Sequence, residues 1–193
     1  MSEEQEEPKE QEQPVPEAEE AGRAGGAVAA ERVMPVVTAG SAIGAGSLAG
    51  LIAGIVQAIW LMIAATATGA PAWGPLKVIS TMVLGVGPLQ TPAFEAGPVL
   101  TGAVVHLVIM VLLGGLFGLI LSRIGMGLSV LLGLAYGLIL WVLSQYVVWP
   151  AIQPDAAAVI SRSPWWGPGL SLLVYGLVLG LLYPLFRGRY AER

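Results

Sequence analysis

Charged residues are distributed very unevenly along this chain of 193 residues. Four windows contain no Asp, Glu, Lys or Arg, namely Val33–Leu76, Ala96–Ser122, Ile124–Pro154 and Ser163–Phe186. They are 44, 27, 31 and 24 residues long, and each exceeds the roughly 20 residues that a helix needs to cross a bilayer. Because a charge at mid-membrane costs on the order of 2.5–3.5 kcal/mol on insertion scales, such windows are typical of transmembrane segments. The pattern predicts four transmembrane helices, near residues 37–66, 97–122, 127–149 and 166–186.

Residues 1–32 have the opposite character. They hold ten acidic and three basic residues (net −7), whereas residues 33–193 hold three acidic and six basic residues (net +3). Glu, Gln, Pro and Ala dominate the segment, and it has no aromatic residue to bury, which is typical of disorder. We therefore expect a disordered acidic cytoplasmic tail at 1–32, a transmembrane domain at 33–186 and a short basic cytoplasmic tail at 187–193.

The overall composition excludes an ordinary soluble domain. Charged residues make up 11% of the chain and hydrophobic residues 55%, whereas soluble domains carry about 25% charged residues. The expected fold is an all-α membrane protein, a four-transmembrane-helix bundle whose surroundings are the lipid bilayer.

Lys and Arg predict the orientation. Four spans place both termini and the 122–126 turn on one side, together with seven of the nine basic residues; only Lys77 and Arg162 lie opposite. By the positive-inside rule, the N- and C-termini are expected in the cytoplasm of a multi-pass protein of the cell membrane.

The connection between the first two predicted spans is too long for a simple turn. Its apolar run, Pro75–Leu84, is too short to span a bilayer and too hydrophobic for water, so a short interfacial or re-entrant helix is expected there. At its end, Glu95 precedes Gly97-Pro98, where an acid suits the start of a helix, and we expect it to act as a helix cap.

Each predicted span carries glycines four residues apart, and residues at i and i+4 share one helix face. Such faces allow close helix packing, which replaces the hydrophobic effect as the driving force inside lipid. The predicted packing glycines are Gly46, Gly50, Gly54, Gly114, Gly118, Gly133, Gly137, Gly176 and Gly180.

Similar strings recur between the spans. The segment 114–121 (GGLFGLIL) is similar to 176–183 (GLVLGLLY), and 48–54 (LAGLIAG) is similar to 131–137 (LLGLAYG). The strings suggest a duplicated helical hairpin, whose two halves would run parallel because each has two spans.

The strings GAVVHLVIMVLLGGLFG, GLAYGLILWVLSQYVVWPAI and LSLLVYGLVLGLLY resemble a group of small uncharacterised bacterial four-helix integral membrane proteins, a domain of unknown function. The resemblance covers roughly residues 40–186. His106 and Trp149-Pro150 match positions of that pattern, and Leu173 stands where a second His would be expected. The resemblance implies the four-helix topology and no activity.

His106, the only histidine, lies inside the second predicted span. An ionisable residue in the membrane is a functional candidate by default, here as a proton relay or a haem or pigment ligand. The alternative is a neutral imidazole that hydrogen-bonds to another helix.

A few uncharged polar residues suggest a second site. Gln57, Thr101, Tyr136, Ser144 and Gln145 are candidates, with His106, for an outward-facing polar vestibule, or else for hydrogen bonds between helices. No catalytic residues and no metal ligands are predicted, because the chain has no Cys, no paired carboxylates and no metal-ligand spacing.

The favoured function is that of a non-enzymatic multi-pass protein, an accessory or structural subunit of a membrane assembly. Its expected partners are other membrane protein subunits or a second copy of itself; no cofactor is expected, and no basic patch supports nucleic-acid binding. One alternative is a small solute transporter or channel. A second alternative is a cofactor-binding membrane protein that uses His106.

Overall fold

A computed structural model describes residues 38–122 and 126–191, with side chains up to Gly188. All of these residues belong to one unit, Pro35–Arg193, and only this unit is described below. The acidic segment 1–32 lies outside the described residues, as does the end of the predicted basic tail.

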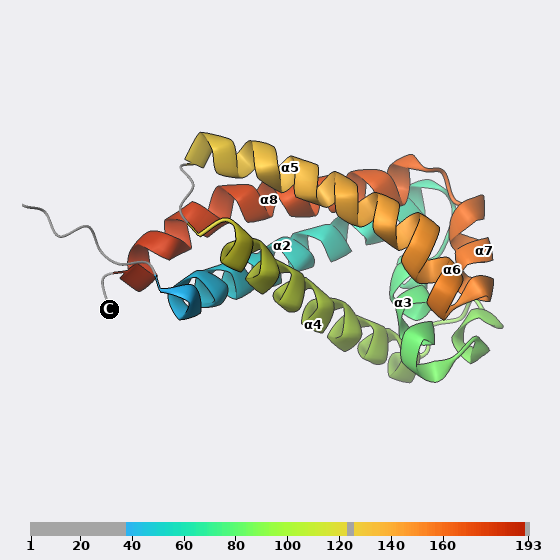
Figure 1. The fold of residues 1–193 in the computed structure, drawn as a ribbon. Helices are drawn as coiled ribbons and strands as arrows, with labels where there is room; N and C mark the ends of the chain where they lie inside the picture. Colours follow the sequence, from blue (N-terminus) through green and yellow to red (C-terminus); the bar gives the residue numbers. More distant parts are fainter. Residues whose placement is uncertain (1–37, 123–125, 192–193) are drawn as a thin grey trace, which may run out of the picture. The chain divides into compact units, whose positions relative to one another are not determined.

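Four long helices form the described part of the unit (Figure 1). The third is continuous through a π-helical turn, η2, and the short helix α6. The bounds are Ala39–Ala67 for α2, Ala96–Ile120 for α4, Met126–Leu143 for α5, Ser144–Val148 for η2, Trp149–Ile152 for α6 and Trp166–Ala191 for α8. All four are long and apolar enough to cross a membrane, and no strand occurs in the described ranges. The predicted all-α bundle with four candidate spans is therefore confirmed.

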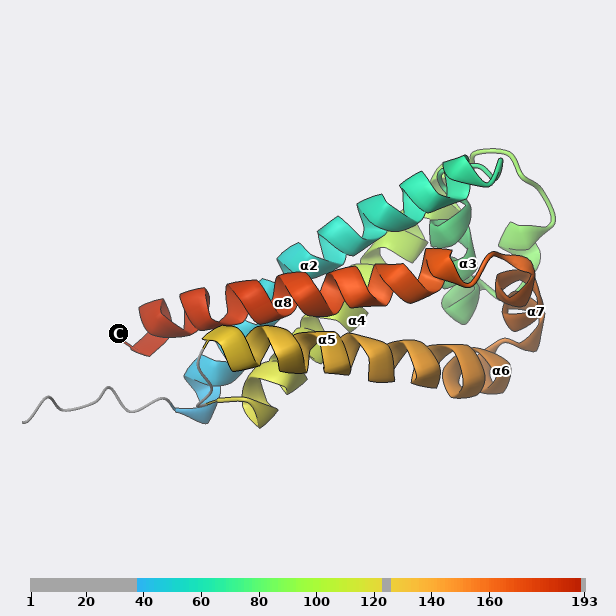
Figure 2. The same cartoon turned by 90° about the horizontal axis from the view of Figure 1, so that it is seen from above.

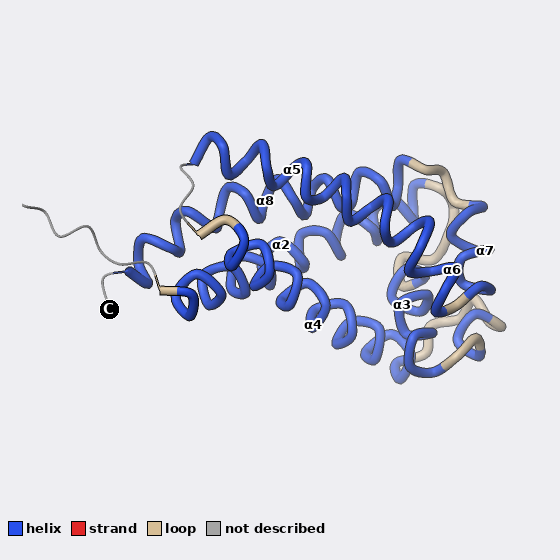
Figure 3. Tube along the Cα trace, in the orientation of Figure 1, coloured by secondary structure: helices blue, strands red, loops and turns tan. Residues whose placement is uncertain are grey.

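The short helices gather at one end of the bundle (Figures 1 and 3). They are α3 (Gly74–Leu84), the 3₁₀ turn η1 (Gly87–Leu89), α6 and α7 (Pro154–Arg162). We call this the connection end, and the opposite end, where α2 and α5 begin, the terminal end. The helix predicted between the first two spans is α3, which starts directly before Pro75 because proline favours the first turn of a helix.

The long helices do not all pack on one another. α2 packs along both α4 and α8, and α5 packs along α8, whereas the backbones of α4 and α5 hardly approach each other. The same arrangement is seen from above in Figure 2, where α8 lies between α2 and α5. α3 packs on α4, where Gly102 meets the carbonyl of Leu76, leaving no room for a Cβ.

Glycines line two of the three interfaces between long helices. In the α2–α4 pair, a Cβ on Gly46 would collide with the Gly114 carbonyl, and one on Gly50 would lie 2.5 Å from the Met110 carbonyl. In the α5–α8 pair, a Cβ on Gly133 would collide with the Gly176 carbonyl. Backbones approach this closely only where side chains are absent, which provides the contact area that holds helices together in lipid.

The two pairs repeat each other residue by residue. Gly46 faces Gly114 and Gly118 just as Gly133 faces Gly176 and Gly180. Positions in α2 and α5 thus correspond at a spacing of 87 residues (133 minus 46), and those in α4 and α8 at 62 (176 minus 114). The chain is built from two hairpins with the same internal packing. The first spacing differs by one helical turn from the alignment of the strings 48–54 and 131–137, because the contacts match Gly50, not Gly54, to Gly137.

The outside of the bundle is apolar. On α4 alone, Leu100, Val104, Val108, Leu112 and Leu116 are exposed, and they recur at the four-residue spacing of one helix face. Exposed apolar faces of this extent are typical of lipid contact and not of a soluble monomer. The chain is a multi-pass membrane protein by this criterion.

Candidate functional site

A cavity of about 740 Å³ occupies the connection-end half of the bundle. Its walls come from α2, α4, α5 and α8, and from α3 and α7 at the end of the bundle, and they are mostly apolar. Ile109 and Leu113 of α4 and Leu140 and Leu143 of α5 all line it. In Figure 3, α4 and α5 diverge toward the connection end, so the cavity lies where these two helices separate.

A difference between the hairpins explains why this side is open. Under the repeat, the α2–α8 contact corresponds to a contact between α5 and α4. On the closed side, Ala49 is fully buried in the core, where it allows α8 to approach closely. The residue that corresponds to Ala49 in α5 is Tyr136 (49 plus 87), whose ring holds α4 away.

Aromatic residues fill the bundle between the cavity and the terminal end. The hydroxyl of Tyr136 donates to the Leu113 carbonyl at 2.9 Å, and its ring lies 5.3 Å from that of Phe117. The Phe117 ring also meets the ring of Tyr183 edge-on at 5.7 Å, and the Tyr183 hydroxyl donates to the Gly118 carbonyl. Nearer the cavity, Tyr175 donates to the Met110 carbonyl at 2.8 Å. These side chains tie α5 and α8 to α4, and they lie beyond the end of the cavity wall.

Gln57 is the most deeply buried amide in the wall, with 4% of its surface exposed. Its Nε2 donates to Ser171 Oγ of α8 at 3.4 Å. Its Oε1 is fully buried and has no hydrogen-bond partner among the described residues. A buried amide oxygen without a partner is rare in proteins, since it has lost its water and gained nothing in exchange.

His106 also lines the cavity, and its Nε2 lies 2.9 Å from the Gly54 carbonyl of α2. Because a carbonyl can only accept, Nε2 carries the proton in this contact. That nitrogen is therefore already used in an interhelical hydrogen bond. To ligate a metal through Nε2, the ring would have to give up this bond.

The π-helical turn places two more polar residues in the wall. Ser144 and Gln145 lie in η2 and line the cavity. The turn precedes Pro150, which has no N–H to donate to the Tyr146 carbonyl and whose ring would clash with it. The helix instead widens, and Trp149 N–H bonds the Ser144 carbonyl five residues back. Such π-turns are frequent at functional sites.

A buried lysine fixes α3 over the start of α4. Lys77 is 3% exposed, and its Nζ donates to the carbonyls of Thr91 (2.6 Å) and Ala93 (3.0 Å) and to Glu95 Oε2 (2.8 Å). All three ammonium protons therefore have acceptors, and the charge is paired with Glu95. Glu95 is the N-cap residue of α4, as expected from its position, but its side chain makes no cap hydrogen bond and binds Lys77 instead.

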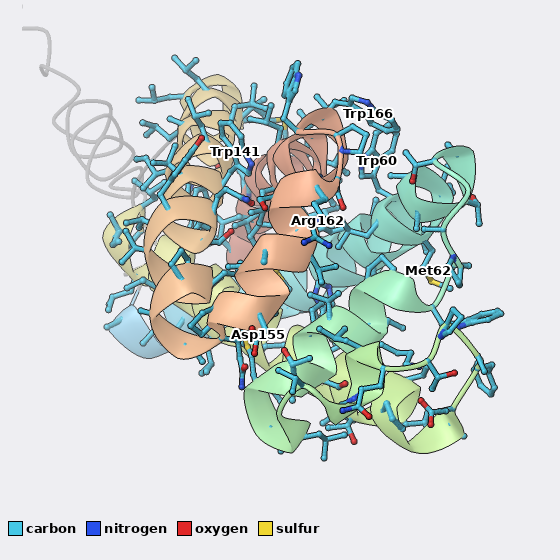
Figure 4. The ribbon with its side chains drawn as sticks, turned by 90° about the vertical axis from the view of Figure 1, so that its right-hand side faces the viewer. Trp60, Met62, Trp141, Asp155, Arg162 and Trp166 are labelled. Carbon is cyan, nitrogen blue, oxygen red and sulfur yellow. The ribbon has the colours of Figure 1, made fainter. Side chains whose placement is uncertain are left out.

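α7 belongs to the other wall of the connection end. Gln153, directly before α7, donates from Nε2 to the Thr81 carbonyl of α3 at 3.0 Å and so links the two short-helix regions. Figure 4 looks onto this end and shows Asp155 and Arg162 at opposite ends of α7. Within the described part of the chain, these two charged residues make no ion pair with each other.

The structure therefore brings together only part of the expected polar set. Gln57, His106, Ser144 and Gln145 line one cavity, whereas Tyr136 lies beyond its end and Thr101 is not part of the wall. Tyr175, Lys77 and the π-turn are not found by sequence reasoning, because their roles depend on contacts between elements far apart in the sequence. Among the described residues, no three His, Cys, Asp or Glu side chains are grouped so that they could hold a metal ion.

Comparisons with family models, with curated proteins and with solved structures find no match for this chain. The resemblance to small bacterial four-helix membrane proteins thus rests on the motifs quoted above.

Proposed function

We propose that this chain is a non-enzymatic, accessory membrane protein that binds an apolar molecule dissolved in the bilayer. The observation that carries the proposal is the cavity between α4 and α5. Ligand sites of small molecules typically have volumes of about 300–1,000 Å³ and mainly apolar walls with a few polar groups. The cavity, at about 740 Å³ and with Gln57, Ser144 and Gln145 in its wall, has this character.

The route of entry follows from which helices are packed. The sides formed by α2 with α4, α2 with α8 and α5 with α8 are closed by close packing, and glycines line two of the three. The remaining side, between α4 and α5, faces the surroundings of the bundle. In a membrane these surroundings are lipid, so a hydrophobic molecule enters sideways without crossing water.

The location is part of the proposal. With the termini in the cytoplasm of a cell-membrane protein, as the Lys and Arg distribution favours, the connection end lies on the outer side. The cavity then opens toward the outer leaflet. A bound molecule is held there for a partner subunit or a second copy of the chain.

The two alternatives have less support. A transporter or channel needs a route to the other side, and the side chains of Tyr136, Phe117 and Tyr183 lie between the cavity and the terminal end. A haem or pigment site at His106 would have to use Nδ1, because Nε2 is engaged by Gly54.

Saturable binding of a hydrophobic probe tests the proposal. The full chain in lipid nanodiscs is titrated with a long-chain alcohol brominated at its tail, and quenching of tryptophan fluorescence is followed. Trp73, Trp149 and Trp166 line the cavity, so a bound probe should give a saturable component above the linear quenching from lipid partition.

A matched pair of variants decides where the probe binds. Ile109→Phe with Leu140→Phe fills the cavity and should abolish the saturable component. Val108→Phe with Ile139→Phe adds the same bulk on exposed faces of the same two helices and should leave it unchanged. Purely linear quenching of the unmodified chain, or equal effects of the two variants, would overturn the proposal.

A further inference from the structure

Resting on this proposed function, we infer the chemical class of the ligand. The ligand is an electrically neutral molecule with an apolar body and a hydrogen-bond donor, and the donor is bound by Oε1 of Gln57. A long-chain alcohol is the simplest member of the class.

The hydrogen-bond network fixes which atom of Gln57 is free. Ser171 Oγ donates its one proton to the Pro168 carbonyl at 2.7 Å, so toward Gln57 it can only accept. The Gln57 group that faces Ser171 must therefore be the NH₂ group, which agrees with the 3.4 Å distance from Nε2 to Ser171 Oγ. This leaves Oε1 as a fully buried acceptor without a partner among the described residues. The Gln57 side chain lines the cavity through its other atoms, so a ligand donor reaches Oε1 once the amide turns toward the cavity. A ligand that supplies an O–H or N–H here restores the bond that the amide lost on burial.

The charges of the wall indicate that the ligand is neutral. Among the described residues, the one charged side chain in the wall is that of Lys77, and its three protons are taken by Thr91, Ala93 and Glu95. Arg162 at the connection end is not part of the wall, and neither is Asp155. An anionic or cationic group would thus be desolvated without a counter-charge, which disfavours charged ligands strongly.

Two other side chains in the wall carry acceptors. Nδ1 of His106 can accept because Nε2 is the protonated nitrogen, and Oε1 of the half-buried Gln145 can accept as well, whereas the hydroxyl of Ser144 is directed to the Trp141 carbonyl at 3.4 Å. Most of the remaining wall residues are apolar or small, so they accommodate a hydrocarbon body. We assign the donor to Gln57 because its Oε1 is the acceptor that lost its water on burial and gained no partner, while the α4 and α5 side chains accommodate the apolar part.

Three brominated probes with the same chain test the inference in the nanodisc titration. They carry a hydroxyl, a methyl ether or a carboxylate as the head group. We expect the alcohol to bind about five-fold more tightly than the ether, because one net hydrogen bond changes the affinity by about this factor. We expect the carboxylate to show no saturable binding at neutral pH. Equal affinities of the alcohol and the ether, or tighter binding of the carboxylate, would overturn the inference.

Variants at the amide assign the preference to Gln57. In Gln57→Leu, which removes Oε1, the alcohol should lose its advantage over the ether. Ser171→Ala removes the partner of Nε2 but keeps Oε1, and it should preserve a preference for the alcohol. Should Gln57→Leu not fold, the probe series on the unmodified chain still decides. If no probe binds saturably, the proposed function itself fails; if all three bind alike, only the inference on ligand class fails.

Discussion

Ala53 of α2 and Leu140 of α5 occupy corresponding positions in the two hairpins, 87 residues apart. Ala53 is fully buried in the core of the bundle on the α2–α8 side, whereas Leu140 lines the cavity on the α4–α5 side. At this repeated position the side chain is therefore a methyl group where α2 meets α8, and an isobutyl group where α5 separates from α4. This difference between the hairpins leads to the first prediction.

Ala53→Leu should destabilise the bundle. Three extra carbons at a filled position force α2 and α8 apart, at a cost of about 1–3 kcal/mol. The reverse change on the other side, Leu140→Ala, should cost about 1 kcal/mol or less, because it enlarges a space that is already open. Unfolding in mixed micelles by SDS titration, followed by circular dichroism, measures both. Equal losses would show that the two sides do not differ in packing.

Gly114→Ala should be poorly tolerated. A Cβ there would collide with the Gly46 carbonyl and lie 2.6 Å from the Cα of Gly50, and backbone cannot yield as a side-chain end can. We expect a loss of about 1–3 kcal/mol in the same titration. Gly97→Ala is the matched control, since a Cβ added there would meet no atom within 4 Å and alanine favours helix. A loss at Gly97 as large as that at Gly114 would contradict the role of close backbone approach.

Lys77→Met should loosen α3 and the segment before α4. The change leaves the carbonyls of Thr91 and Ala93 without their donor and Glu95 without its counter-charge, and it should cost about 2 kcal/mol. Glu95→Gln keeps an acceptor on a half-exposed side chain and should cost less than about 1 kcal/mol. Limited proteolysis should cut the segment near residues 85–95 faster in Lys77→Met than in Glu95→Gln. The opposite order would refute this account.

Pro150→Ala should weaken ligand binding and increase the stability of the bundle. It supplies the N–H that Tyr146 lacks, so the π-turn can revert to regular helix with a gain of about 1 kcal/mol. Reversion rotates Ser144 and Gln145 relative to the cavity, so saturable binding of the brominated alcohol should weaken. SDS titration and the nanodisc titration measure the two effects. Weaker binding without higher stability would mean that the proline acts by some other route.

The sequence is sufficient to predict the spans, because the charge-free windows follow directly from the cost of charge in lipid. The predicted span 97–122 and the observed α4, Ala96–Ile120, differ by one or two residues at each end. The repeat is also visible in the sequence, but its register is not. Four-residue glycine spacings align equally well one turn apart, and only the contact of Gly133 with Gly176 selects the spacing.

The cavity itself cannot be predicted from the sequence. Gln57 and Ser144 are recognisable as polar residues within spans, but whether they meet depends on how far α4 stands from α5. That distance is set by Tyr136 and Leu140 acting across helices. In the sequence, Lys77 is only one of the basic residues of an outer connection. In the structure it is buried against the carbonyls of the loop before α4, and the conformation of that loop cannot be predicted from sequence patterns.

In a symmetric dimer of identical hairpins, the two interfaces between the hairpins would be the same. Both would be closely packed, or both would be open. Joining two unequal copies in one polypeptide removes that constraint. Here the α2–α8 interface, with the alanines of α2, stabilises the bundle. The α4–α5 interface is free to adapt its spacing to the molecule that binds there.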